Sequence, residues 1–403
     1  MKQCLAYLCV LALSAACDAN GSSSDSHTTT GGASAAGGAQ TQGGSGGSTA
    51  AGSSNGGTGG VSSGGTGGAS GGSTSGGAAG NSGAAGAGGG AAGAGGGGMG
   101  FKCPSDVGTF SLPSGKATHI AGTTPVDSFN MNAGFTNVEG PVWIGDSLYF
   151  SEMTSATPIP PARILKLGPG NVVSIAVADS GSNGLAVDSS GNLFAAVHKD
   201  GSISQIMLPS GPATSIVGMY MSNRFISPND LAIRSDGTIY FSDPSYQNST
   251  NPAPQSATRL YRVSPPPTRT VTAVTDAPMM PNGVTLSPDE KTLYVTGQGG
   301  FKKFAVMADG SLGPASDFAS KFNGDGMAVD CLGNVYVAGG SPSVEVFSSA
   351  GMSLGTISLD NGGNSTNVAF GGSDHKTIYI TAQGNDGQRG VFSIASSVPG
   401  FPY

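Results

Sequence analysis

Short apolar runs separated by polar turns follow one another along residues 101–403, and no long stretch has the periodicity of an amphipathic helix. The runs are rich in β-branched and aromatic residues, and Gly, Asp, Ser and Pro stand between them. This pattern is typical of short strands joined by tight turns. It predicts an all-β domain.

One unit recurs six times in this part of the chain: a polar residue, an apolar strand, a tight turn and a second strand. The copies lie 42 to 53 residues apart and begin at Glu139, Asn183, Asn229, Asn282, Asp325 and Asn367. A period of about 40 to 50 residues built from hairpins is the mark of a propeller blade. We therefore expect residues 101–403 to form a six-bladed β-propeller.

The residues between the copies are expected to supply the outer strands of the blades. Candidates are Arg163–Leu167, Leu260–Val263 and Val344–Phe347. The ring must also close, and we expect residues 391–394 to pair into a blade that contains the segment 106–122.

The repeat also predicts a site. The first strand of each blade lines the central channel, so the first residue of each copy reaches the same height about one axis. Two carboxylates and four amides would face one small space, a ligand set that hard divalent cations prefer. Asn and Asp also begin strands for turn geometry alone, so a purely structural interpretation stays open. Glu139 favours the cation, because Glu has no turn preference and its burial without a cation is costly.

Three polar residues follow the second strands and should rim the same face: Glu152, His198 and Asp243. For His198, lining a ligand pocket and occupying an ordinary loop position are both open.

The first hundred residues have a different composition. Residues 1–16 are expected to be an export signal, because Lys2 precedes a short apolar run. Cys17 follows Ser-Ala-Ala, which resembles a bacterial lipoprotein cleavage site, with ordinary signal cleavage as the alternative. Residues 17–100 are almost entirely Gly, Ser, Ala and Thr, so we expect a disordered tether. The domain would then be exported to the bacterial periplasm or cell surface as a monomer, held at the membrane only by the lipid on Cys17.

Charge and motifs narrow the chemistry. The net charge of −7 argues against a nucleic-acid or anionic-membrane surface. There is no Gly-x-Ser-x-Gly elbow in a strand–helix context, no Cys/His zinc spacing and no phosphate loop. Cys103 and Cys331 remain in the folded part. An exported protein could pair them, but the sequence does not place them within bonding distance, and we expect free thiols rather than a disulfide.

Several phrases at the repeats resemble the gluconolactonase and regucalcin (senescence marker protein) family. The resemblance covers about residues 125–400 and rests on these phrases: Glu139-Gly-Pro-Val-Trp with Leu148-Tyr-Phe-Ser, Arg224-Phe with Ser227-Pro-Asn-Asp, Tyr240-Phe-Ser-Asp-Pro, Pro281-Asn-Gly-Val, Gly324-Asp-Gly-Met-Ala-Val-Asp, Thr366-Asn-Val-Ala-Phe-Gly-Gly and Val398-Pro-Gly.

The resemblance implies a lactonase with one divalent metal, held by Glu139, Asn282 and Asp325. Asn229 would contact metal or substrate. Calcium is our expectation for the metal, with zinc, manganese and magnesium open.

The resemblance also bears on substrate binding, for which we expect Asn183, Asn229, His198, Arg224 and Tyr246. Two phrases depart from the family: Val197-His198-Lys199 replaces Glu-His-Gly, and Ser245-Tyr246-Gln247 replaces Pro-Tyr-Gly. Both departures lie at the expected pocket rim, so they bear on substrate identity more than on metal binding.

The implied reaction is hydrolysis of a sugar lactone or related cyclic ester by water activated at the metal. Asp325 is the expected general base, and metal hydroxide is the alternative. Two other functions stay open: a surface-displayed propeller that binds carbohydrate or protein without catalysis, and a hydrolase or synthase of the strictosidine-synthase type. The latter type lacks the set Glu139, Asn282 and Asp325.

Overall fold

The structure is a computed structural model. It describes residues 101–124, 126–129, 134–155, 159–247, 255–319, 323–339 and 341–401, which all belong to one unit, Gly88–Tyr403. The expected export signal, the acylated Cys17 and the tether 17–100 lie outside the described residues.

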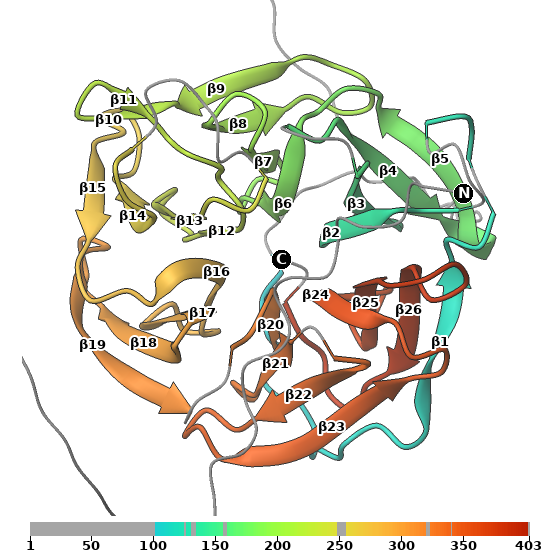
Figure 1. Ribbon diagram of the computed structural model, residues 1–403. Helices are drawn as coiled ribbons and strands as arrows, with labels where there is room; N and C mark the ends of the chain where they lie inside the picture. Colours follow the sequence, from blue (N-terminus) through green and yellow to red (C-terminus); the bar gives the residue numbers. More distant parts are fainter. Residues whose placement is uncertain are drawn as a thin grey trace, which may run out of the picture. The chain divides into compact units, whose positions relative to one another are not determined.

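Six four-stranded antiparallel units surround a central axis, as the repeat predicts (Figure 1). The first three blades are β2 (Asn137–Ile144), β3 (Ser147–Met153), β4 (Ala162–Gly168) and β5 (Val172–Val177); β6 (Ser182–Val187), β7 (Leu193–Val197), β8 (Ser202–Ile206) and β9 (Ala213–Val217); and β12 (Leu231–Ile233), β13 (Ile239–Asp243), β14 (Arg259–Val263) and β15 (Val271–Val274). The next two are β16 (Met279–Leu286), β17 (Thr292–Gln298), β18 (Gly300–Val306) and β19 (Leu312–Ala319); and β20 (Met327–Val329), β21 (Val335–Ala338), β22 (Ser343–Phe347) and β23 (Ser353–Leu359).

The sixth blade closes the ring with strands from both ends of the domain. It consists of β24 (Asn364–Gly371), β25 (Thr377–Gln383), β26 (Gly390–Ala395) and β1 (Lys116–Ala121). β1 pairs antiparallel with β26, with His119 opposite Phe392, and two of its residues also pair in parallel with β23. The expected closure and the expected outer strands are confirmed.

The remaining elements are small. A two-stranded hairpin of β10 (Met219–Tyr220) and β11 (Asn223–Arg224) precedes the third blade. A 3-10 turn at Pro169–Asn171 is the one helical element in the described part of the chain. None of the helical structure described there is long and apolar enough to cross a membrane.

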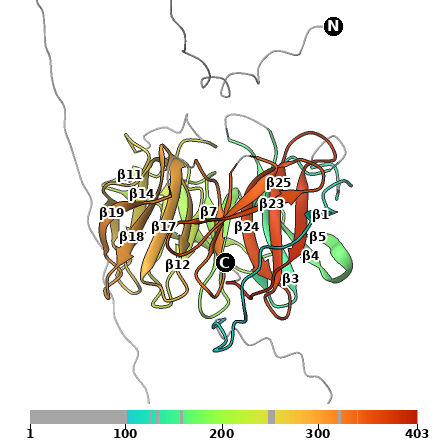
Figure 2. The ribbon, with the colours of Figure 1, turned by 90° about the horizontal axis from the view of Figure 1, so that it is seen from below.

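The hydrophobic core lies between neighbouring blades. Every residue of β3 and β7 is buried, whereas the outer strands β5 and β9 are largely exposed. One cluster joins Val142 and Tyr149 of the first blade to Leu185 and Ala195 of the second. Because both faces of an inner strand pack against other blades, these strands have continuous apolar runs rather than strict alternation. In side view the strands stand along the axis (Figure 2).

Cys103 and Cys331 form a disulfide, so the expectation of free thiols was wrong. Closure of the ring brings the segment before β1 against the turn that follows β20. Phe101 packs there on His375, with ring centroids 4.1 Å apart, and on Phe401. A pairing across 228 residues depends on this closure, which local sequence does not display.

Candidate functional site

The six polar residues that open the repeats lie in or just before the inner strands, and these strands surround one axis (Figure 1). Four of them lie within β2, β6, β16 and β24: Glu139, Asn183, Asn282 and Asn367. The other two, Asn229 and Asp325, come two residues before β12 and β20. The repeat therefore gives these six residues similar places in their blades, and their roles stay predictions.

Neighbouring blades approach closely at this level. A Cβ on Gly184 would lie 2.5 Å from the carbonyl oxygen of Asn229, and a Cβ on Gly326 would collide with the side chain of Asn367. Glycine follows the polar residue in four copies because no side chain fits between the blades there.

A hydrogen bond joins each pair of neighbouring blades close to the channel. In ring order the bonds are Ser151 Oγ to Ser182 Oγ (2.7 Å), Gly184 N to Asn229 O (2.6 Å), Val284 N to Asp230 Oδ2 (2.9 Å), Thr296 Oγ1 to Asp325 O (2.9 Å), Gly326 N to Thr366 O (2.8 Å) and Thr366 Oγ1 to Val138 O (2.6 Å). These bonds fix the backbones that carry the polar side chains.

The charges of three carboxyl groups, on Glu139, Asp230 and Asp325, influence one another across the blades. Burial, followed by the charges of Asp325 and Asp230, raises the pKa of Glu139 well above its ordinary value. Burial and the charge of Asp230 raise the pKa of Asp325 to about 7. Carboxylates held this close in a desolvated space favour either a proton or a cation between them.

Asp230 is a site residue that the sequence reasoning missed. It is buried, burial raises its pKa to about 7, and its Oδ2 accepts the Val284 N–H. The available signal was its position, since it stands where four other copies have glycine.

Two amides near the carboxyl groups have atoms without hydrogen-bond partners. The Asn282 side chain donates a hydrogen bond to Asp325, while its buried Oδ1 has no hydrogen-bond partner. The Nδ2 of Asn183 is also buried without a partner. Asn367, in contrast, hydrogen-bonds Glu139, and its Oδ1 accepts the Val368 N–H at 2.8 Å.

This donor set fits a hard divalent cation. Such cations take carboxylate and amide oxygens, and Glu139, Asp325 and the orphaned Asn282 Oδ1 provide both kinds. Within the described ranges, no three His, Cys, Asp or Glu side chains gather as a metal-binding group. A cation here would therefore need the amides of Asn282 and Asn229 among its ligands.

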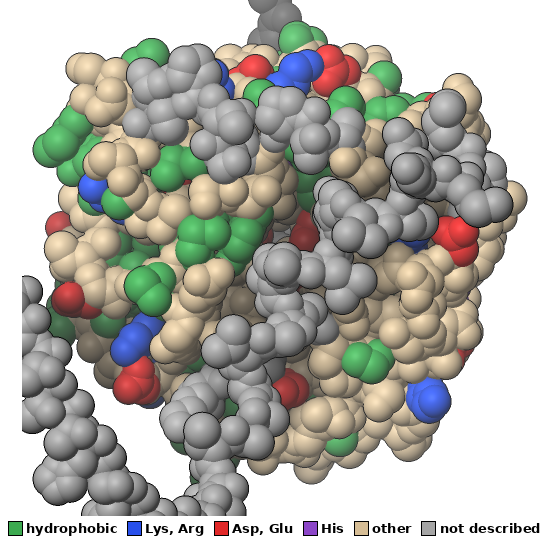
Figure 3. All heavy atoms as spheres, in the orientation of Figure 1, with side chains coloured by type: hydrophobic (Ala, Val, Ile, Leu, Met, Phe, Trp, Pro, Cys, Tyr) green, Lys and Arg blue, Asp and Glu red, His purple; other side chains and the backbone are tan. Residues whose placement is uncertain are grey.

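Tyr246 lies against the first residues of β16. Burial raises its pKa to about 12, and the charge of Asp325 contributes, which places the two side chains near each other. The Tyr246 hydroxyl donates to the carbonyl oxygen of Met280 at 3.3 Å, and its side chain stays partly exposed. Figure 3 shows a hollow at the centre of the ring with an acidic side chain inside it and hydrophobic side chains beside it.

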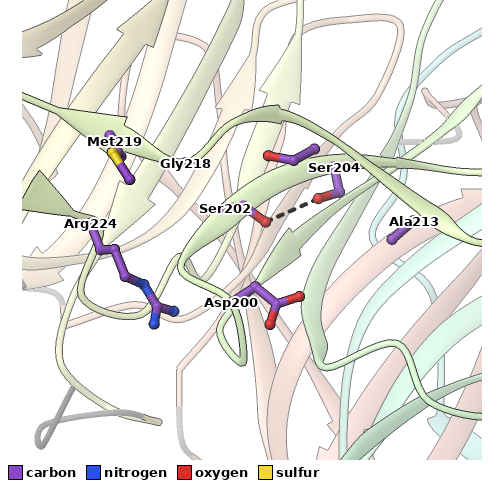
Figure 4. Close-up of a pocket in the computed structure, with 8 residues that line it drawn as sticks. Asp200, Ser202, Ser204, Ala213, Gly218, Met219 and Arg224 are labelled. Atoms are coloured by element: carbon purple, nitrogen blue, oxygen red, sulfur yellow. Dashed lines mark hydrogen bonds between the residues drawn. The ribbon is translucent and has the colours of Figure 1, made fainter. Parts of the chain in front are cut away.

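The other two predicted substrate residues have different surroundings. Arg224 donates to the Lys199 carbonyl oxygen at 3.3 Å and lines a pocket of about 360 Å³ with Ser202, Ser204 and Asp200 (Figure 4). That pocket lies against β8 and β9, away from the inner strand of the second blade. His198 is fully buried, with its Nε2 2.8 Å from the carbonyl oxygen of Pro160, and burial lowers its pKa. Their roles in substrate binding stay predictions.

The family model described as SMP-30/Gluconolactonase/LRE-like region matches residues 110–384. The chain belongs to this family. A gluconolactonase of Zymomonas mobilis is 29% identical over 282 residues, which are 61% of this chain and 76% of that protein.

Two solved structures are similar to this member of the SMP-30/gluconolactonase family. A gluconolactonase from Xanthomonas campestris is 28% identical with a TM-score of 0.55, and 65% of this chain and 86% of the other are covered. A calcium-binding regucalcin from Agrobacterium tumefaciens is 17% identical with a TM-score of 0.56, covering 71% of this chain and 97% of the other. The second likeness shows the fold alone.

Proposed function

We propose that this protein hydrolyses a sugar lactone or a related cyclic ester with the help of one divalent cation in the channel. Family membership and the gluconolactonases among its relatives support the reaction class. The observation that carries the site is the pair of the buried Glu139 and the half-buried Asp325, whose pKa values are both raised, with the orphaned Asn282 Oδ1.

Glu139, Asn282, Asp325 and Asn229 would hold the cation, and calcium is our proposal for its identity. The cation would polarise the lactone carbonyl and acidify a bound water. The raised pKa of Asp325 suits a group that accepts a proton near neutral pH.

Substrate would be oriented by groups around the cation. The unpartnered Nδ2 of Asn183 is a buried donor, and a hydroxyl or carbonyl oxygen of the substrate would satisfy it. Tyr246, whose pKa is affected by the charge of Asp325, would contact the ring of the sugar. Asn183 and Tyr246 would therefore bind and orient the substrate and would take no part in proton transfer.

The test uses the purified full-length chain and glucono-lactone. Bound metal is quantified, and hydrolysis is followed as prepared, after chelation, and after return of calcium, zinc, manganese or magnesium. We expect activity to fall on chelation and to return with at least one cation. Asp325→Ala should lower turnover by at least about 100-fold while the far-ultraviolet circular dichroism stays unchanged.

Asp317→Asn is the matched control, because Asp317 is an exposed partner of Lys302 on the outer strand β19. It should keep wild-type activity. Substantial turnover by Asp325→Ala would remove Asp325 from the mechanism, and full activity in chelator would remove the cation.

A further inference from the structure

A buried carboxyl group holds the backbone of the segment that leads to Asn229. Asp243, the last residue of β13, accepts the N–H groups of Ile226 at 3.0 Å and Ser227 at 2.7 Å. Both residues of this segment and Asp243 are buried. The backbone two residues before Asn229 is therefore fixed in place.

Ser227 is joined to Gln247 by two hydrogen bonds. Its hydroxyl donates to Gln247 Oε1 at 3.1 Å, and it accepts the Gln247 N–H at 3.2 Å. This pair locks the position of the Gln247 backbone and the direction of its side chain.

The same Gln247 Oε1 also accepts a hydrogen bond from Asn229 Nδ2, at 3.4 Å. The backbone of Asn229 is fully used as well, since its N–H donates to Ser242 O and its carbonyl accepts the Gly184 N–H. The only freedom left to Asn229 is the orientation of its carboxamide. An acceptor at Gln247 draws Nδ2 toward itself and turns Oδ1 away.

We propose that Gln247 is a positioning residue that sets the carboxamide of Asn229, so that its oxygen rather than its nitrogen is presented to a cation or substrate in the channel. This inference rests on the proposed function, because it assigns Asn229 to the same site. The resemblance places glycine at this position in the family. Glycine has no side chain that could accept the Asn229 hydrogen bond, so this contact depends on the glutamine of this chain.

The test compares Gln247→Leu, which removes the acceptor and keeps the volume, with Gln247→Glu, which restores an acceptor oxygen. Calcium binding to the full-length protein is measured by titration calorimetry, and hydrolysis of glucono-lactone is split into kcat and KM. We expect Gln247→Leu to weaken calcium binding by about 10-fold, the usual effect of losing an outer-shell partner, and Gln247→Glu to recover most of it. A purely structural role would lower thermal stability in both variants and leave the calcium affinity alone.

Gln205→Leu is the matched control, because Gln205 is a half-buried residue of the outer strand β8. It should bind calcium like the wild type. Equal calcium affinity of wild type and Gln247→Leu would overturn the inference and leave the proposed function intact.

If the wild type bound no cation, the proposed function would fail separately. The inference would then be judged by nuclear magnetic resonance of the Asn229 side-chain amide. Its proton shifts should change in Gln247→Leu and return toward wild type in Gln247→Glu, and unchanged shifts would overturn the inference.

Discussion

Thr366 Oγ1 donates a hydrogen bond of 2.6 Å to the carbonyl oxygen of Val138, which lies 228 residues earlier in the chain. This bond joins the sixth blade to the first immediately before Glu139. The next residue of the sixth blade, Asn367, hydrogen-bonds the Glu139 side chain. The carboxyl cluster is therefore completed only when the ring is closed.

Cation binding should release protons. Burial and neighbouring charges raise the pKa of Asp325 to about 7 and shift that of Glu139 upward as well, so the cation-free site holds protons at pH 6. A cation must displace them, so the apparent affinity should fall as pH falls from 8 to 6. Calorimetry in buffers of different ionisation enthalpy would measure the released protons. An affinity independent of pH over this range would contradict the prediction.

Glu139→Gln should separate stability from cation binding. Because burial disfavours the charged form of Glu139 and raises its pKa well above the ordinary value, the uncharged amide should change thermal stability in chelator little, by about 0.5 kcal/mol or less. The loss of a charged ligand should weaken calcium binding by at least about 10-fold. Thermal unfolding with chelator and with calcium gives both quantities, because a bound cation stabilises the folded state. A large destabilisation in chelator would show that Glu139 is ionised there.

The buried Asp243 should make stability fall as pH rises. Burial raises its pKa from 3.8 to about 7 in the folded state. Between these two pH values the Asp243 carboxyl group is ionised in the unfolded chain and protonated in the folded protein. The contribution to the free energy of unfolding is therefore lost from about pH 4 upward and fully lost above about pH 7, by an amount on the order of 4 kcal/mol.

Exposed carboxylates with lowered pKa values, such as Asp309, have the opposite trend, so the measurement is a difference. The free energy of unfolding of wild type minus that of Asp243→Asn, in chelator, should decrease from pH 4 to pH 7. A difference that grows over this range would contradict the sign.

The disulfide should contribute strongly to stability. Cys103 and Cys331 close a loop of 228 residues, and a loop of this length corresponds to about 5 kcal/mol in the chain-entropy account. The double variant Cys103→Ser with Cys331→Ser should melt at a lower temperature than the oxidised wild type. Reductant should lower the wild-type melting temperature and leave the double variant unchanged. Equal melting temperatures of oxidised and fully reduced wild type would refute this.

Gly326→Ala should be far more harmful than Gly168→Ala. A methyl group on Gly326 would collide with the side chain of Asn367 across the blade junction, whereas one on Gly168 has no neighbour closer than 3.8 Å. We expect a loss of about 2 kcal/mol or more for Gly326→Ala, together with weaker cation binding, because Asp325 would shift. For Gly168→Ala we expect a change within about 0.5 kcal/mol. Urea unfolding of both variants measures the comparison, and equal effects would show that the junction can relax.

Much of the fold could be predicted because it repeats in the chain. The apolar runs and turn residues specify each hairpin locally, and six similar copies can pack only against one another. The repeat by itself also predicts that Glu139 and Asp325 face one axis. It places Asn282 there too, and family resemblance added the assignment of Glu139, Asn282 and Asp325 as the metal ligands.

What the sequence by itself determined, then, is the blade, its number of copies and the residue that opens each copy. The tertiary structure decided the contacts between copies: the Cys103–Cys331 disulfide, the inclusion of Asp230 in the carboxyl cluster and the contact between Gln247 and Asn229. The physical reason is the separation along the chain over which each interaction acts. Hydrophobic periodicity and turn chemistry act over a few neighbouring residues, whereas disulfide pairing, mutual repulsion of carboxyl groups and amide orientation depend on distances that only the closed ring defines.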